Sequence, residues 1–218
     1  IAGKRIETPT TTQKDTRVWI VHKLPGELVS ESDDRKRPTV LERIRKIAAE
    51  HLKPVGRLDM NTEGLLLVTN DGQYARDLEL PKHRLHRTYR VRVHGILTES
   101  KLNAMRRGMK IETTRYAPMK VQLEHYVRDR TNQWLSITCT EGKNRQIRKV
   151  LKTLGLNVTR LIRISFGDYK LDKVKLGQVV EVPVKPVAGQ RCRGALYTRK
   201  VDIAKPATTN EVQWVRNL

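Results

Sequence analysis

The stretch GRLDMNTEGLLLVTNDG, residues 56–72, carries the chain from a glycine-bounded loop into an apolar run and out through a turn. The run LLLVT, residues 65–69, predicts a short buried strand, and the NDG sequence after it predicts a turn. Asp59 lies in the loop ahead of that strand, two residues after Arg57. A carboxylate at the edge of a core costs free energy unless it is paired. Asp59 therefore requires a cation or several backbone N–H donors.

Two interpretations of Asp59 follow from the residues alone. Arg148 lies at the start of a predicted helix whose other face is apolar, and a planar guanidinium can hold a carboxylate bidentately. Such a pair would keep the acid ionised and fix its direction, as a nucleophile requires. The alternative is that Asp59 only caps a turn, because Asp beside Asn and Thr is ordinary turn chemistry. Arg57 and Arg148 would then be ordinary solvated bases.

The charge of the chain indicates a polyanionic partner. Among 218 residues, 44 Lys and Arg face 23 Asp and Glu, which gives a formal net charge of +21. Mixed signs would solvate a surface at less cost to the compact state, so the excess favours nucleic acid as the partner. Membrane-surface binding would call for a basic amphipathic helix or an apolar run at one end, and the sequence has neither. We expect no membrane association.

Metal and nucleotide-hydrolysis chemistry have no support in the sequence. The two cysteines, Cys139 and Cys192, lack metal-ligand spacing and are too few for a disulfide framework. The six histidines are scattered without an i, i+4 pair, and a Walker-type GxxxxGK[ST] sequence is absent. We therefore expect no metal and no nucleotide cofactor, in a reducing compartment.

Hydrophobic periodicity predicts an α+β fold, because strands and helices mix without regular βαβ alternation. One helix has Ile147, Val150, Leu151 and Leu154 along a single buried stripe. Predicted strands are residues 18–24, 65–69, 87–93, about 119–126 and 134–139, around 159–164 and around 178–184. Predicted helices are residues 40–52, 73–80 and 99–107, and the segment of the stripe at 147–154, which Gly155 closes.

The strand at residues 87–93 alternates strictly, with Tyr89, Val91 and Val93 on one face and Arg90 and Arg92 on the other. That spacing is typical of a core strand residue, which is the plain interpretation of Tyr89.

The chain divides into three parts by composition. Residues 1–17 are polar and predict an extended connector, and residues 18–188 contain every predicted helix and strand. Residues 189–218 are basic and patternless, and they predict a tail that needs a partner to become ordered.

Four segments resemble the signatures of RNA pseudouridine synthases, specifically of the ribosomal branch typified by RsuA and RluB. Residues 56–72 resemble the central signature of that family, and HKLPGELVSESDDRKRPTVLERI its opening strand and loop. RTYRVRVHG resembles the tyrosine-bearing strand, and NQWLSITCTEGKNRQIRKVLKTLGLNVTRLIRISFGDYKL the final signature. The matching blocks run in the family's order from about residue 18 to 184, which makes the resemblance specific.

The resemblance implies a role for particular residues. Asp59 would be the nucleophile, Tyr89 the tyrosine that stacks on the target base and assists proton removal, and Arg148 the basic partner of Asp59. Arg57 would contact RNA and help to hold the nucleotide out of its helix. The other expected RNA contacts are Lys143, Asn144, Arg145, Gln146, Lys149 and Arg160. Leu161 and Ile162 would belong to the apolar wall of the base pocket.

The implied reaction is the isomerisation of a uridine of ribosomal RNA, with the large subunit as the expected source, without cofactor or metal. The implied fold is that family's catalytic fold, with a mixed, largely antiparallel sheet flanked by helices. The expected partners are ribosomal RNA and a ribosomal or pre-ribosomal particle. The alternative is a ribosome-assembly factor or ribosome-bound protein that keeps this fold for RNA binding while catalysis is dispensable or lost.

Two features depart from the branch. Its members usually carry a small N-terminal RNA-binding domain, whereas here residues 1–19 resemble only the end of one. The first residue is Ile rather than Met, and the C-terminal tail is basic. Both features favour a mitochondrion or another organelle over the bacterial cytoplasm.

Overall fold

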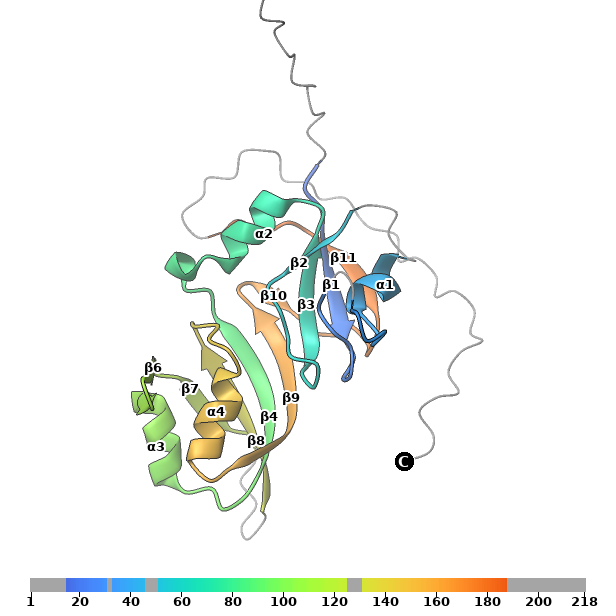
Figure 1. Cartoon of the computed structure of the whole chain (residues 1–218). Coiled ribbons are helices and arrows are strands. Elements are labelled where there is room, and N and C mark those ends of the chain that lie inside the picture. The colour runs from blue at the N-terminus through green and yellow to red at the C-terminus, as the bar shows by residue number, and fades with distance from the viewer. Residues whose placement is uncertain (1–14, 31–32, 46–50, 125–130, 188–218) are drawn as a thin grey trace, which may run out of the picture.

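One mixed sheet organises the protein, with strand order β11-β1-β3-β9-β4-β8-β7 (Figure 1). The computed structural model describes residues 15–30, 33–45, 51–124 and 131–187. The strands are β1 (Val18–Lys23), β2 (Lys53–Val55), β3 (Glu63–Thr69), β4 (Arg87–His94), β7 (Lys120–Leu123), β8 (Asn132–Cys139), β9 (Asn157–Phe166), β10 (Tyr169–Lys170) and β11 (Val179–Val182). β2 pairs with β3 and β10 with β9, and the pairing of β3 with β9 is parallel whereas the other pairings are antiparallel.

Helices flank this sheet, which confirms the predicted α+β class. They are α1 (Val40–Arg45), α2 (Gly72–Glu79), α3 (Glu99–Arg107), α4 (Gln146–Thr153) and the short 3-10 helix η1 (Pro81–His83). Asp71 caps α2 by accepting from the N–H groups of Gln73 and Tyr74, and the hydroxyl of Thr98 caps α3.

The structure differs from the sequence prediction at a few short elements. A separate hairpin of β5 (Met109–Ile111) and β6 (Thr114–Tyr116) and the two-residue β10 were not predicted, because two or three residues are too few to show an alternating pattern. The helix predicted for residues 40–52 is described only to Arg45, and residues 51–52 are not helical. Residues 46–50, most of the connector 1–17 and the tail 189–218 lie outside the described residues.

In the first half of the sheet, β11-β1-β3, β1 and β3 are buried on both faces and β11 is half-buried. Leu65 and Leu67 of β3 pack into a cluster with α2, whereas Leu66 and Val68 pack into a second cluster with α1. Every residue of β3 is buried. This two-sided burial explains why the run at residues 65–69 is apolar without alternation.

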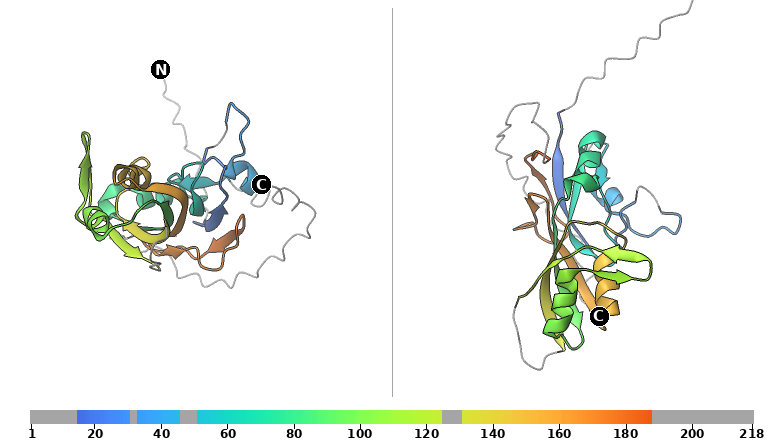
Figure 2. Two further views of the ribbon diagram at one scale, coloured as in Figure 1. Left: turned by 90° about the horizontal axis from the view of Figure 1, so that it is seen from below. Right: turned by 90° about the vertical axis from the view of Figure 1, so that its left-hand side faces the viewer.

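The second half, β9-β4-β8-β7, is buried on one face. Val91, Val93, Leu135 and Ile137 pack beneath α3 and α4 in a third cluster, and Figures 1 and 2 show these two helices over that half. The opposite face of β4 presents Arg90 and Arg92 to solvent. The alternation of residues 87–93 is therefore confirmed.

The two halves meet where β3 pairs with β9, through Glu63 opposite Ile162 and Gly64 opposite Arg163. We call this meeting point the seam. Gly64 has φ of +102°, and a Cβ added there would lie 2.3 Å from the backbone oxygen of Arg163. Only glycine can occupy this position without a backbone shift. The loop that carries Asp59 enters β3 at the seam.

Candidate active site

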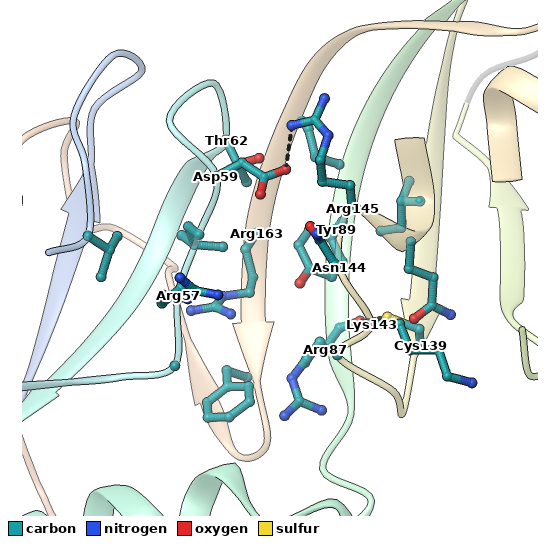
Figure 3. Close-up of a pocket in the computed structure, with 18 of the residues that line it drawn as sticks. Arg57, Asp59, Thr62, Arg87, Tyr89, Cys139, Lys143, Asn144, Arg145 and Arg163 are labelled. Carbon is teal, nitrogen blue, oxygen red and sulfur yellow. Dashed lines mark hydrogen bonds and ion pairs between the residues drawn. The ribbon is translucent and has the colours of Figure 1, made fainter. Parts of the chain in front are cut away.

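A cavity of about 1320 Å³ opens at the seam, and Figure 3 shows side chains that line it. Its walls come from the Asp59 loop, β4, β9, the loop before α4, and the segment after β1. Pockets for small molecules measure roughly 300–1,000 Å³, so this cavity has room for more than one nucleotide.

Asp59 faces two arginines of the second half-sheet. One carboxylate oxygen, Oδ2, lies 3.1 Å from Nη1 of Arg145 and 3.9 Å from Nε of Arg148. The contact with Arg145 is the dashed line in Figure 3. The two guanidinium groups thus approach the same oxygen, and the Asp59 side chain remains 30% exposed.

The bidentate pair expected between Asp59 and Arg148 is not what the structure contains. Nη2 of Arg148 donates instead to the backbone oxygen of Asn61 at 2.7 Å, and Nη1 donates to that of Val158 at 3.4 Å. Its Nε is buried without a hydrogen-bond partner. Arg148 therefore holds the Asp59 loop mainly through the backbone, and the shorter ion pair belongs to Arg145.

The two arginines occupy different environments. Arg145 is half-exposed and has φ of +51° at the position that begins α4. Arg148, one turn into the helix, keeps only 16% of its side chain exposed. Burial lowers the pKa of Arg148, the charge of Arg145 adds to that decrease, and Asp59 opposes it. Arg145 is thus the guanidinium that an incoming anion can reach.

Lys23, at the end of β1, holds the same loop from the first half-sheet. Its side chain is fully buried, and Nζ donates to the backbone oxygens of Leu24, Met60 and Thr62 at 2.8, 3.0 and 2.9 Å. Three consecutive backbone oxygens, at residues 60–62, therefore accept from two cations on opposite sides of the seam. No pattern in the sequence distinguished Lys23 from a solvated lysine.

Tyr89 lies on the cavity face of β4, opposite Arg163 of β9 and Ile137 of β8. Burial raises the pKa of its phenol, and the charge of Arg163 opposes that increase. The phenol is therefore neutral at pH 7. Tyr89 also packs against two of the apolar clusters. It is therefore both a residue at the edge of the core and a residue that lines the cavity.

Arg163 is a buried cation that the sequence analysis missed. Its side chain is 3% exposed, and Nε donates to the backbone oxygen of Leu65 at 2.7 Å across the seam. The signal was present, since Leu161 and Arg163 are two apart in a strand and share its cavity face. Arg87 of β4, also missed, lines the cavity as well.

The remaining expected contacts divide by location. Arg57, Lys143, Asn144, Arg145, Gln146 and Leu161 line the cavity. Gln146 is buried, and both polar atoms of its amide lack a partner within the described residues.

Three expected residues are absent from that lining. Ile162 lies on the opposite face of β9 from Leu161, because side chains alternate, and packs against the cluster beneath α2. Ile162 therefore does not line the cavity. Arg160 shares the outer face and makes a two-point ion pair with Glu63 at 2.8 and 2.9 Å. Lys149 is exposed on α4, outside the cavity.

Within the described ranges, no group of three or more His, Cys, Asp or Glu is arranged to hold a metal ion. The same part of the chain contains no helix long and apolar enough to cross a membrane.

The sequence comparisons with known proteins all point to one family. The sequence profile described as RNA pseudouridylate synthase matches residues 17–153. An uncharacterized RNA pseudouridine synthase of Rickettsia bellii is 38% identical over 174 residues, which are 80% of this chain and 74% of that protein. Ribosomal large subunit pseudouridine synthase B of Salmonella typhi is 39% identical over 173 residues. This match covers 79% of the chain and 59% of the relative.

Solved structures agree with the sequence matches. A crystal structure of a pseudouridylate synthase superposes with a TM-score of 0.67 at 28% identity, covering 77% of this chain and 70% of that one. The expected catalytic fold is therefore confirmed.

Proposed function

Because the chain belongs to the RNA pseudouridine synthase family, we propose that it converts a uridine of large-subunit ribosomal RNA into pseudouridine. The similarity to the Salmonella large-subunit enzyme supports this choice of RNA. The observation that carries the proposal is the position of Asp59 at the edge of the cavity, ion-paired with Arg145 and close to Arg148. A turn cap alone would not require two guanidinium groups.

Asp59 is the proposed nucleophile. The reaction breaks the bond from ring N1 to the ribose, turns the uracil and joins C5 to the ribose, while the proton of C5 is lost and N1 gains one. A temporary bond between the Asp59 carboxylate and the target nucleotide holds the fragments together. The backbone bonds from Lys23 and Arg148 fix the loop, so that the carboxylate is positioned before the substrate arrives.

Tyr89 provides the surface on which the uracil turns. Stacking on an aromatic ring contributes roughly 1–3 kcal/mol per base, and the neutral phenol can take part in proton transfer next to C5. Taking the nucleotide out of its helix costs a few kcal/mol. Basic residues that line the cavity, with Arg57 and Lys143 among them, offset that cost through phosphate contacts.

The site of action inside the cell stays a prediction. The basic composition supports a ribosomal or pre-ribosomal particle as the partner. Location in an organelle is tested by fractionating cells that express the tagged full-length protein.

Asp59→Asn tests the proposed function. We expect this variant to form no pseudouridine in large-subunit ribosomal RNA while its RNA affinity stays within about threefold of wild type, because one exposed carboxylate contributes little to a polyanion interface. Asp168→Asn, which makes the same change on an exposed residue outside the cavity, is the matched control and should retain activity. Pseudouridine mapping and equilibrium RNA binding are the two measurements.

The outcomes separate the candidate functions. Pseudouridine formed by Asp59→Asn would show that another residue is the nucleophile. A wild-type protein that binds the RNA but never modifies it would be the assembly factor of the alternative interpretation.

A further inference from the structure

One end of the cavity contains cations that form no ion pair. Arg57, Arg87 and Arg163 line this end, below Asp59 in the view of Figure 3, and none of them forms an ion pair with any residue that the structure describes. The carboxylate of Glu79 lies on the same wall, but it accepts from the backbone N–H of Gly56 at 2.6 Å. This end therefore differs from the Asp59 end, where cations and an acid are paired.

Arg87 and Arg163 are held on one aromatic ring. Their guanidinium carbons lie 4.7 and 5.2 Å from the centroid of Phe166, a buried residue at the end of β9. Nη1 of Arg87 donates to the backbone oxygens of Leu85 and Thr140 at 3.0 and 3.3 Å. Nη2 of Arg163 is buried and has no hydrogen-bond partner. Two like charges are thus fixed side by side on neutral partners.

Within the described residues, no acid makes an ion pair with these two arginines. Burial lowers the pKa of Arg87 and the charge of Arg163 lowers it further, whereas Tyr89, Cys139 and Glu79 raise it. A cation–π contact stabilises a guanidinium only modestly, whereas burying a cation without a counter-ion is costly. Planar guanidinium groups match the oxygens of a phosphate in pairs. Figure 3 shows Arg87 on the far side of Tyr89 from Asp59, so an anion here would be separated from the nucleophile.

We propose that Arg57, Arg87 and Arg163 form an anion-binding subsite that holds one phosphodiester of the RNA chain beside the target nucleotide. The subsite would fix the backbone on one side of the flipped nucleotide while Tyr89 and Asp59 act on its base and sugar. Its existence rests on the proposed function only in that RNA is the ligand, and the test uses binding rather than turnover.

The experiment neutralises each side of the contact in turn. RNA oligonucleotides carry a single uncharged methylphosphonate at successive linkages around the target uridine, and affinity is measured in an Asp59→Asn background that performs no chemistry. We expect one linkage at which neutralisation weakens binding about tenfold, with a decrease of about 1 in the slope of log affinity against log salt. In Arg87→Gln, neutralising that linkage should no longer weaken RNA binding.

Two further variants keep the result interpretable. Arg57→Gln, an exposed residue, should reduce the same linkage effect and poses little risk to folding if Arg87→Gln is unstable. Arg107→Gln, exposed on α3 and outside the cavity, should leave the effect intact.

The proposal is overturned if no single linkage distinguishes wild type from Arg87→Gln and Arg57→Gln. It is equally overturned if inorganic phosphate binds this end of the cavity, seen as changes in the NMR signals of the arginine side chains, while every neutralised linkage is tolerated. The site would then take a free phosphate. Pseudouridine formation by the wild type is scored separately, so failure of the subsite and failure of the proposed reaction give different patterns.

Discussion

The two halves of the sheet bury their strands in different ways, and the cavity lies where they meet. The first half is covered on both faces, so β3 is apolar at four successive positions, Leu65 to Val68. The second half is covered on one face, so β4 alternates and turns Tyr89 toward the cavity. The first half supplies a rigid strand and a loop with the acid, and the second supplies the phenol and the cations. Neither half contains the site alone.

The consequence is that the site depends on the seam. Asp59 precedes β3, whereas Arg145, the residue before α4, and Arg148 of α4 lie on the other half. Arg163 crosses the seam to bond the backbone of Leu65. Changes at the seam should therefore affect stability and site geometry together, whereas changes at the cavity rim should affect binding alone.

Gly64→Ala is expected to have the largest effect on stability, because it disturbs the close contact between the two halves of the sheet. The added Cβ would lie 2.3 Å from the backbone oxygen of Arg163, at a φ of +102° that side chains rarely adopt. We expect a loss of at least about 3 kcal/mol in the free energy of unfolding, since both backbone strain and overpacking apply. Urea denaturation measures this loss.

Gly56→Ala is the matched control. Gly56 also has positive φ, +66°, but a Cβ there would meet nothing within 4 Å. Its cost should stay near 1 kcal/mol, which reflects conformational strain without a clash. Equal losses for the two variants would show that the close approach at the seam does not govern stability.

Arg148→Ala and Arg145→Ala compare a residue at the seam with a half-exposed residue at the edge of the cavity. Arg148→Ala removes a buried charge that bonds the backbone of Asn61, and hydrogen bonds to charged groups contribute about 1.5–3 kcal/mol. We expect a stability loss of about that size together with loss of pseudouridine formation. Arg145→Ala removes a half-exposed ion pair, so stability should change by about 0.5 kcal/mol or less while RNA binding weakens.

Thermal or urea unfolding and RNA titration together measure this pair of variants. The same stability loss in both would contradict the assignment of Arg148 to the seam.

The sequence predicted the elements whose pattern reflects a local rule. The alternation of residues 87–93 and the stripe of Ile147, Val150 and Leu151 are each visible within one element, and both were confirmed. Leu154, the last residue of the predicted stripe, is half-buried just beyond the end of α4. The hairpin β5–β6 was missed because its strands are too short to show a period.

The site was predicted less completely, because its contacts join residues far apart in the chain. Ile162 and Leu161 are adjacent in sequence, yet strand alternation sends them to opposite faces, and only Leu161 reaches the cavity. Asp59 was recognised through its loop, but the nearer arginine depends on how α4 begins at Arg145 with positive φ. Lys23 and Arg163 are buried by tertiary packing, which no local pattern records.

Lys23 tests the first half of the sheet through pH, with an expected effect smaller than that of Gly64→Ala or Arg148→Ala. Burial lowers the pKa of its ammonium from 10.5 to about 8 in the folded protein. Below pH 8 the lysine is protonated in both the folded and the unfolded chain, so the full cost of burying the charge is present. Between pH 8 and 10.5 the folded chain releases the proton while the unfolded chain retains it, so the free energy of unfolding rises with pH.

The free energy of unfolding of the wild type should increase by about 1 kcal/mol relative to that of Lys23→Met between pH 8 and 9. Urea denaturation of both proteins at each pH measures this difference. Groups common to the two proteins cancel in that difference. A difference that stays constant from pH 7 to 9 would mean that Lys23 keeps its proton while it holds the backbone of the Asp59 loop, and that its three bonds to backbone oxygens outweigh the cost of burial.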